Sequence, residues 1–291
     1  MMTEYVLGGI PVIVTIENEY LKADISTLGA ELQSLYGKKE QTEYLWQGDE
    51  KIWKGRSPLL FPFVGRLKDD RYVYEGKTYV MPKHGFAKNS EFSVKEKYDN
   101  AVVLALKSGE HTDIYPFEFT LEIKFWLVGK SLKVVQRVTN EGKKEMYFSL
   151  GAHPGFNCRI GDCILFPDDE ESSAYRLTEE KLLTCTPVEK AIRNHKLTVT
   201  EDVFADDALI FKGLRSDTIA LKRWDGRSVT VSFGSAPCLG IWAKKGAPYV
   251  CIEPWFGVDD SSEATGRIEE KACIQHIGPG ECFRFPMTIE V

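Results

Sequence analysis

Long uninterrupted hydrophobic runs are missing from this sequence of 291 residues, and so is an excess of basic charge. No segment approaches the roughly 20 apolar residues that a membrane-spanning helix needs. The N-terminus carries no basic stretch followed by an apolar core, which is the pattern of a secretory signal. Lysine and arginine number 37 against 43 acidic residues, and both signs are mixed along the chain. We therefore expect a cytoplasmic protein that binds neither a membrane nor nucleic acid.

Helical patterns are scarce as well. Only two short stretches, 179–183 and 201–208, could form a turn or two of helix. Strands and helices do not alternate along the chain, which argues against a dinucleotide-binding domain with a parallel sheet. No linker, internal repeat or low-complexity block divides the sequence, so we expect a single domain over residues 1–291.

Strand patterns, by contrast, recur from one end of the chain to the other. Apolar and polar residues alternate in four pairs of segments with turn residues between them, at 71–80, 91–107, 117–140 and 218–233. A single segment at 283–289 alternates in the same way. Alternation of this kind is typical of antiparallel hairpins with one buried face. Because 43% of the residues are hydrophobic, enough apolar material is present for a large core. The pattern predicts an all-β fold, a large antiparallel β-sandwich with few short helices.

The seven cysteines show neither a disulfide pattern nor a metal-binding pattern. They are an odd number at scattered positions, namely 158, 163, 185, 238, 251, 273 and 282. A chain of this size needs no disulfide to fold, so we expect free thiols in a reducing compartment. Cys158 and Cys163 are the closest pair and have only His153 nearby as a third ligand. No second cluster completes a tetrahedron, which argues against a zinc site.

Two of the five histidines lie in compact segments that contain glycine and proline. His84 stands in PKHGFA at 82–87, and His153 stands in GAHPGF at 151–156. Glycine and proline interrupt the strand pattern there, which exposes each ring at a loop or strand end, where binding groups are often found. The alternative for either residue alone is a structural histidine with one hydrogen bond. Two histidines in matching Gly-Phe contexts favour a functional site.

Glu253 lies at the end of an apolar run, Tyr249–Ile252, and is followed by Pro254, Trp255 and Phe256. The run is typical of a buried strand, and a buried carboxylate is costly unless it is paired or used in chemistry. Desolvation would raise its pKa, which suits a general base. The alternative is a structural ion pair with lysine or arginine. We expect an enzyme that acts on a small polar substrate through Glu253 and the two histidines.

Five segments, in order and spread over nearly the whole chain, match the marks of a known family. They are FPFVGR at 61–66, HGFA at 84–87, GAHPGF at 151–156, ADDALI at 205–210 and CIEPWFG at 251–257. With these segments the chain resembles the aldose 1-epimerases, or galactose mutarotases, and in particular their LacX-like branch. The resemblance implies a twisted sandwich of many antiparallel strands that holds a sugar in an open cleft and uses no metal and no cofactor.

The resemblance also implies roles for individual residues. Glu253 would take the proton of the C1 hydroxyl while His153 protonates the ring oxygen, and rotation about C1–C2 before reclosure inverts the anomer. His84 would donate to a ring or neighbouring hydroxyl oxygen, and Arg66 and an aspartate would fix other hydroxyls. Histidine and a glutamate of raised pKa can both change protonation near neutral pH, as ring opening requires.

The aspartate implied by the family is one of two adjacent residues, Asp206 and Asp207. In an extended segment these two side chains would face opposite ways. The family carries its aspartate before a variable residue and an apolar run, a pattern that favours Asp206. Either carboxylate could instead cap a turn.

Four further residues bear on the substrate. Arg66 follows Gly65, where better-known galactose mutarotases carry asparagine, so one hydroxyl contact is missing. Arg56 resembles a position that related hexose-6-phosphate epimerases use for substrate, whereas Lys88 stands where those enzymes tend to carry arginine. A phosphorylated sugar is therefore a second substrate class. Trp242 could offer an aromatic platform to a pyranose, or pack in the core instead.

Two other functions fit the same residues less well. A carbohydrate-binding or regulatory module could keep the sandwich and the cleft without useful turnover, but the acid and the base candidate are both present. A glycosidase needs two carboxylates that flank the glycosidic bond, and Glu253 has only the pair Asp206 and Asp207 as candidate partners.

Overall fold

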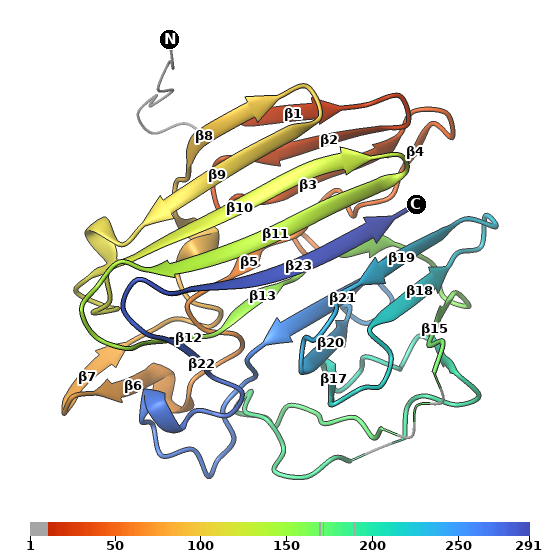
Figure 1. Ribbon diagram of the computed structural model, residues 1–291. Helices are drawn as coiled ribbons and strands as arrows, with labels where there is room; N and C mark the ends of the chain where they lie inside the picture. Colours follow the sequence, from red (N-terminus) through yellow and green to blue (C-terminus); the bar gives the residue numbers. More distant parts are fainter. Residues whose placement is uncertain (1–10, 169, 171, 189) are drawn as a thin grey trace.

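The computed structural model describes residues 11–168, 170, 172–188 and 190–291, and strands dominate them (Figure 1). Every pairing between named strands in this part of the chain is antiparallel, as the alternating sequence pattern predicts. The all-β prediction is confirmed. Among the described residues, no helix is long and apolar enough to cross a membrane.

A nine-stranded sheet forms one layer of the molecule (Figure 1). It contains three of the predicted hairpins and the predicted C-terminal strand, with turns at Asp99-Asn100, Gly129-Lys130 and Asp225-Gly226. In order of pairing, its strands are β16 (Lys196–Thr198), β15 (Cys163–Leu165), β18 (Thr218–Lys222), β19 (Ser228–Ser232), β23 (Cys282–Glu290), β11 (Ser131–Asn140), β10 (Phe119–Val128), β9 (Ala101–Lys107) and β8 (Ser93–Tyr98).

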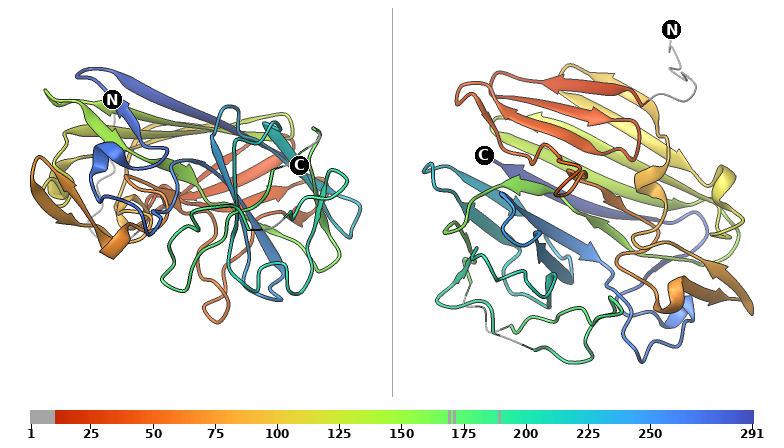
Figure 2. Two further views of the ribbon diagram at one scale, coloured as in Figure 1. Left: turned by 90° about the horizontal axis from the view of Figure 1, so that it is seen from below. Right: turned by 180° about the vertical axis from the view of Figure 1, so that it is seen from behind.

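A six-stranded and a four-stranded sheet lie against this layer, as the views in Figures 1 and 2 agree. The six-stranded sheet comprises β17 (Leu209–Lys212), β20 (Cys238–Trp242), β21 (Tyr249–Phe256), β13 (Leu150–Ala152) and β5 (Leu59–Leu60), with β14 (Gly155–Asn157) also paired to β21. The four-stranded sheet comprises β1 (Ile13–Glu17), β2 (Leu21–Ser26), β3 (Leu32–Gly37) and β4 (Thr42–Glu43). Two small sheets complete the fold, the predicted hairpin of β6 (Arg71–Tyr74) with β7 (Lys77–Val80), and β12 (Met146–Phe148) with β22 (Gln275–Ile277).

The core lies between the layers. Alternate residues of β10 and β11 are buried, and their apolar side chains meet those of the opposite sheets in one cluster of buried residues that runs from Val14 to Ile289. Strand β21 is buried along its whole length. A strand covered on both faces reads as a continuous apolar run, which explains why its one carboxylate, Glu253, stands out in the sequence.

The helices are not where the sequence suggested. The stretches 179–183 and 201–208 form turns, because Lys181 and Asp207 adopt left-handed backbone angles (φ 63° and 72°) that end a helix. Short 3₁₀ helices occur elsewhere, as η1 (Lys68–Asp70), η2 (Ala87–Asn89), η3 (Gly109–His111) and η4 (Ile268–Glu270).

Candidate active site

Strand β21 presents alternate side chains to two different environments. Ile252 and Phe256 belong to the core cluster between the sheets. Glu253 and Trp255 alternate with them along the strand and line a cavity. Pro254 lacks an N–H, and its neighbour across the ladder is Leu239 of β20. The alternation of side chains along one buried strand therefore carries Glu253 into the cavity wall.

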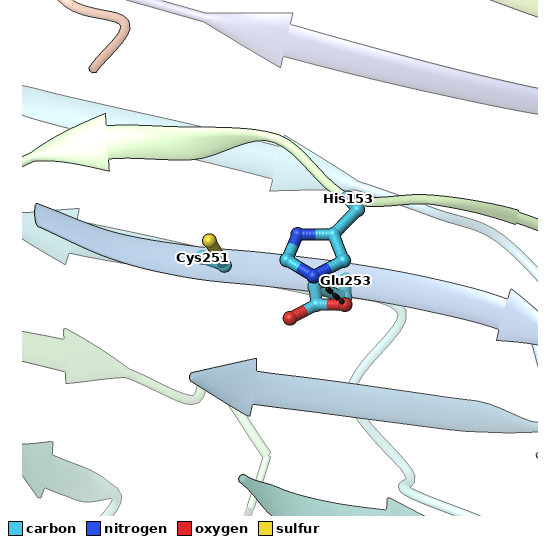
Figure 3. A group of neighbouring side chains, drawn as sticks. All are labelled: His153, Cys251 and Glu253. Carbon is cyan, nitrogen blue, oxygen red and sulfur yellow. Dashed lines mark ion pairs between the residues drawn. The ribbon is translucent and has the colours of Figure 1, made fainter. Parts of the chain in front are cut away.

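His153 stands directly across from Glu253. Strands β13 and β14 pair with β21 in one continuous register, Gly151 opposite Trp255 and Gly155 opposite Cys251, and His153 falls at the break between them. Residues directly opposite on antiparallel strands have Cβ atoms about 5 Å apart on the same face. The His153 Nε2 atom lies 3.1 Å from Glu253 Oε2. Figure 3 marks this contact with a dashed line. Both side chains are buried, with 8% and 2% of the residue exposed.

Two glycines allow the Trp255 ring to lie flat beside this pair. A Cβ atom built on Gly151 would lie 2.7 Å from Trp255 Cδ1, and one on Gly240 would lie 2.5 Å from Trp255 Cη2. Real Cβ contacts are not that short, so both positions require glycine while the indole stays in place. The indole forms part of the cavity floor.

Two further tryptophans surround His153. The ring centroids of Trp53 and Trp242 lie 5.2 Å and 5.7 Å from that of His153, and the two indoles meet edge to face at 5.5 Å. Trp242 lines the cavity, as its predicted role requires. Trp53 was not predicted, because it lies in a loop after β4 and the sequence around it carries no pattern that distinguishes a site residue from a surface one.

His84 is held in one tautomer by the backbone. Its Nδ1 accepts a hydrogen bond from the Gly65 N–H at 3.1 Å, which leaves the proton of a neutral ring on Nε2. Burial lowers the pKa of His84 well below its usual value, and the charge of Lys83 adds to this, so the ring is neutral at pH 7. The ring centroids of His84 and His153 are 5.8 Å apart. His84 thus offers an N–H donor beside the pair of His153 and Glu253.

These side chains surround a cavity of about 1000 Å³, which is ample for a monosaccharide. Its wall combines aromatic rings with acidic and basic groups. The titratable residues that line it are Glu31, Lys54, Lys83, His84, Lys88, His153, Glu179, Lys181, Asp206, Asp207, Lys244, Lys245, Glu253 and Asp259.

Burial sets the protonation of the central pair. It raises the pKa of Glu253 well above the usual range, and the nearby positive charge of Lys83 opposes this only in part. It lowers the pKa of His153 to about 3. Burial therefore favours the form of the pair in which the proton lies on the carboxyl group and His153 is neutral.

The aspartate that reaches deepest is Asp207 rather than the favoured Asp206. Both line the cavity, but Asp206 is exposed, whereas Asp207 is half-buried and accepts a hydrogen bond from Lys181 Nζ at 2.8 Å. Burial pushes the pKa of Asp207 up, but the Lys181 hydrogen bond and the charge of Lys83 outweigh it, and the net pKa is lowered. The backbone at Asp207 is left-handed (φ 72°), so the segment is a turn and not the extended segment expected from the sequence for this pair.

The two predicted arginines are not among the residues that line this cavity. Arg66 forms a bidentate pair with Asp70, with both N–O distances at 2.8 Å, and its remaining nitrogen donates to the Glu180 carbonyl. The Arg56 guanidinium donates to the Gln33 carbonyl at 3.1 Å. Asp70 lies four residues after Arg66, whereas Glu180 and Gln33 lie in distant segments that the sequence motifs did not indicate. The substrate contacts expected of Arg66 and Arg56 stay predictions.

Comparison with known proteins identifies the family of this chain. The family model described as aldose 1-epimerase matches residues 12–274. The chain belongs to the aldose 1-epimerase family. It is 32% identical to the chromosomal protein LacX of Lactococcus lactis subsp. lactis over 284 residues, which cover 91% of this chain and 95% of that protein.

Solved structures of this family are similar in fold over almost the whole chain. A galactose mutarotase related enzyme from Lactobacillus acidophilus has a TM-score of 0.88 at 32% identity, and the match covers 96% of this chain and 97% of that one. A galactose mutarotase-like protein from Lactobacillus casei has a TM-score of 0.89 at 30% identity, with coverage of 96% and 99%. The LacX-like resemblance read from the five segments is thereby confirmed.

Several lysines that line the cavity were not predicted as site residues. Lys83 precedes His84 and is half-buried, and no hydrogen bond or ion pair of its Nζ occurs within the described chain. Lys88 donates from Nζ to the Lys83 carbonyl at 2.8 Å, and burial lowers its pKa. Asp259 also lines the cavity, and its Oδ1 accepts the Arg66 N–H at 2.7 Å. Lysine is so common on surfaces that its presence in a loop gave no signal.

The residue types of a metal site meet at one place in the described chain. His153, Cys251 and Glu253 offer ligand atoms within 4.8 Å of one another, a group that contains neither Cys158 nor Cys163 (Figure 3). Zinc binds thiolate and carboxylate. Burial raises the pKa of both the Cys251 thiol and the Glu253 carboxyl and so favours the protonated form of both groups, whereas a metal ion binds the deprotonated forms. Acid–base chemistry fits this group better than metal binding does.

Proposed function

We propose that this protein is an aldose 1-epimerase that interconverts the α and β anomers of an aldohexose, with Glu253 as general base and His153 as general acid. The observation that carries the proposal is the buried contact of 3.1 Å between His153 Nε2 and Glu253 Oε2 at the wall of an open cavity. Glu253 Oε2 and Trp255 Nε1 are buried and make no hydrogen bond within the described chain. Buried polar atoms left in this way are suited to a ligand that supplies the missing partners.

The spacing of the two groups suits a hemiacetal. The C1 hydroxyl oxygen and the ring oxygen are both bonded to C1, so a base and an acid must reach two atoms that lie close together. Nε2 and Oε2 lie within hydrogen-bonding distance of each other, and a sugar placed against them can meet both groups at once.

Ring opening moves one proton through each member of the pair. The step begins from the charged form of the pair, which forms when the Glu253 carboxyl group gives its proton to His153 Nε2, 3.1 Å away. Glu253 as carboxylate then takes the proton of the C1 hydroxyl, and His153 as imidazolium gives a proton to the ring oxygen as its bond to C1 breaks. This leaves a carboxylic acid and a neutral imidazole, the state that burial favours in this site. After rotation about C1–C2, the reverse transfers close the ring with the other configuration at C1.

Three other groups would orient the sugar. His84 presents an N–H donor, Asp207 presents a carboxylate that Lys181 holds in place, and the indoles of Trp53 and Trp242 offer apolar faces. An aromatic face packs well against the C–H groups of a pyranose. Such contacts fix the reacting C–O bond relative to the acid and the base.

Anomeric equilibration tests this function. Freshly dissolved α-galactose and α-glucose are followed by polarimetry or proton NMR with and without the protein. Faster equilibration at protein concentrations far below that of the sugar supports the proposal. Saturable sugar binding without acceleration would instead support a carbohydrate-binding or regulatory module.

A phosphorylated hexose is the second candidate substrate, and the lysines of the cavity favour it. Lys54, Lys83 and Lys244 line the cavity, and their Nζ atoms form no ion pair within the described chain. Lysine is a common ligand of phosphate. Galactose 6-phosphate and glucose 6-phosphate should then have higher kcat/KM than the free sugars.

The variant Lys83→Met distinguishes the two candidates. It should lower kcat/KM for the phosphorylated sugar more than for the neutral one if Lys83 binds phosphate. Lys245→Met is the matched control, because Lys245 also lines the cavity but already pairs with Asp202 at 2.7 Å. Equal losses for both sugars in Lys83→Met would favour the neutral substrate.

A further inference from the structure

Two thiols far apart in the sequence lie in contact away from the proposed acid–base pair. The Sγ atoms of Cys238 and Cys273 are 3.6 Å apart, although the residues are separated by 35 positions. Cys238 begins strand β20 and is buried, whereas Cys273 lies in the turn between η4 and β22 and is half-buried. One residue of the pair is therefore partly exposed to solvent, and the other is buried.

The backbone places Cys273 in an uncommon conformation. Its φ angle is 58°, in the left-handed region that non-glycine residues seldom adopt. The turn is closed on both sides of this residue, because the Ile274 N–H donates to the Lys271 carbonyl and Gln275 Nε2 donates to the Cys273 carbonyl. The turn thus holds the thiol against Cys238.

The surroundings of the two sulfurs make them unequal. A hydrogen bond from the Cys238 thiol, with the charges of Lys212 and Lys271, lowers the pKa of Cys273 to about 6 against the effect of burial. The same contact and its own burial raise the pKa of Cys238. At neutral pH the accessible sulfur is a thiolate, the nucleophilic form, and the buried sulfur keeps its proton.

We propose that Cys238 and Cys273 form an oxidation site, at which a peroxide converts the two thiols into a disulfide. The Cys273 thiolate attacks one oxygen of hydrogen peroxide, the O–O bond breaks, and the second oxygen leaves as hydroxide and becomes water. Cys238 then attacks the sulfenic sulfur, the S–O bond breaks, and the hydroxyl leaves as water with the Cys238 proton. The sulfurs lose two electrons and the peroxide gains two.

The remaining cysteines serve as internal references. Cys185 and Cys282 are more exposed than Cys273, but neither contacts another thiol within the described chain. Cys158 and Cys251 are buried, and burial raises the pKa of both thiols. Accessibility alone would direct oxidation to Cys185 and Cys282, whereas a paired thiolate directs it to Cys273.

Peptide mapping tests the site in the full-length chain. Trypsin leaves Cys273 and Cys282 on one peptide, because no lysine or arginine lies between Lys271 and Arg284. The reduced Cys282→Ser variant is therefore treated with equimolar hydrogen peroxide, alkylated and digested. A linked pair of peptides joined through Cys238 and Cys273 is expected, together with the loss of two hydrogens from the intact mass. Cys185→Ser in the same background should give the same link.

A second variant tests the order of the steps. Cys238→Ser should accumulate a sulfenic acid on Cys273, detected as a dimedone adduct. First oxidation at Cys185, or peroxide consumption without a link between Cys238 and Cys273, overturns the proposal.

A measurement on the wild-type protein keeps the proposal testable if a variant fails to fold. The alkylation rate of Cys273 with iodoacetamide should reach half its maximum near pH 6, in line with the pKa of about 6 for this thiol. A half-maximum near 8.5, the value of an ordinary free cysteine, would contradict it.

Discussion

The proton shared by Glu253 and His153 links the chemistry of the site to the stability of the chain. Burial favours a neutral carboxylic acid and a neutral imidazole, and the same desolvation opposes the charged pair from which ring opening begins. The two states differ by the transfer of one proton from Glu253 to His153. A site of this kind gives up folding stability in exchange for groups that can exchange protons with a bound substrate.

Glu253→Gln should therefore stabilise the protein at neutral pH. The pKa of Glu253 is raised in the native state, so the native protein keeps a proton that the unfolded chain releases above about pH 4.5. The stability that this proton provides is complete below that pH and is lost as the pH rises through the native pKa. Glutamine does not titrate, so the unfolding free energy of the variant should rise relative to that of the wild type between pH 4.5 and pH 7.5.

Urea unfolding at the two pH values measures this gain. The quantity of interest is the change with pH in the difference of unfolding free energy between variant and wild type, which cancels effects of the amide itself. Glu110→Gln is the control, because Glu110 is exposed. A difference for Glu253→Gln that is the same at both pH values would refute the raised pKa.

Asp207 and Asp206 should differ sharply on substitution. Asp207→Asn removes the charge that Lys181 holds in the cavity wall, and the loss of a charged hydrogen bond typically lowers kcat/KM by roughly 10- to 100-fold. Asp206→Asn alters an exposed carboxylate and should change kcat/KM little. Steady-state anomerisation kinetics compare the two. A larger loss of kcat/KM in Asp206→Asn than in Asp207→Asn would support Asp206, the residue favoured by the sequence pattern.

The residues that the sequence predicted well are those whose backbone setting is local. Glycine and proline beside His84 and His153, and an apolar run before Glu253, are visible in a few neighbouring residues, and all three side chains meet in the cavity. The orientation of Arg66 depends on Asp70 and Glu180, and that of Arg56 on Gln33. Apart from Asp70, which is four residues from Arg66, these partners lie far away in the sequence and leave no local pattern.

At the scale of elements, the hairpins were predictable and the packing around β21 was not. Alternation with period two and turn residues at Asp99-Asn100 and Gly129-Lys130 predicted these strands and their turns, but not the register shift between Val94 and Glu96 in β8. The opposition of His153 and Glu253 depends on two short strands, β13 and β14, that continue one register across a break. Strands of three residues are too short to show alternation, so the sequence could not pair these two residues.

Gly240→Ala should disturb the cavity floor. The new methyl group would lie 2.5 Å from the Trp255 ring, and overpacking of this kind typically costs about 1–3 kcal/mol of unfolding free energy. Movement of the indole should also lower kcat/KM. Gly278→Ala is the control, because its methyl group would meet only the flexible side chain of Glu281 at 3.3 Å. Urea unfolding and anomerisation rates that match the wild type in Gly240→Ala would show that the ring is not fixed by this contact.

At the scale of the whole molecule, the layers meet in one large core. One large cluster of buried residues, between Val14 and Ile289, joins strands of the nine-, six- and four-stranded sheets, and a smaller cluster lies around Trp255. A single domain over residues 1–291 remains a prediction. The class of the fold was legible from the sequence because every hairpin repeats the same period, whereas the assignment of strands to layers depends on contacts between residues far apart in the chain.

Unfolding of the whole chain tests the single-domain prediction. Far-ultraviolet circular dichroism, tryptophan fluorescence and loss of anomerisation should report one transition with a common midpoint, because the sheets share a core. Two separated transitions would indicate independent domains.

The most direct test of the central claim is a double-substitution cycle on the acid–base pair. Glu253→Gln should nearly abolish mutarotation, and His153→Asn should slow it by roughly 10²–10⁴-fold, as the loss of a general acid does. Because both groups serve one proton exchange, the double variant should be hardly slower than Glu253→Gln alone. Circular dichroism confirms that each variant is folded. A rate close to that of the wild type in either folded single variant would contradict the account.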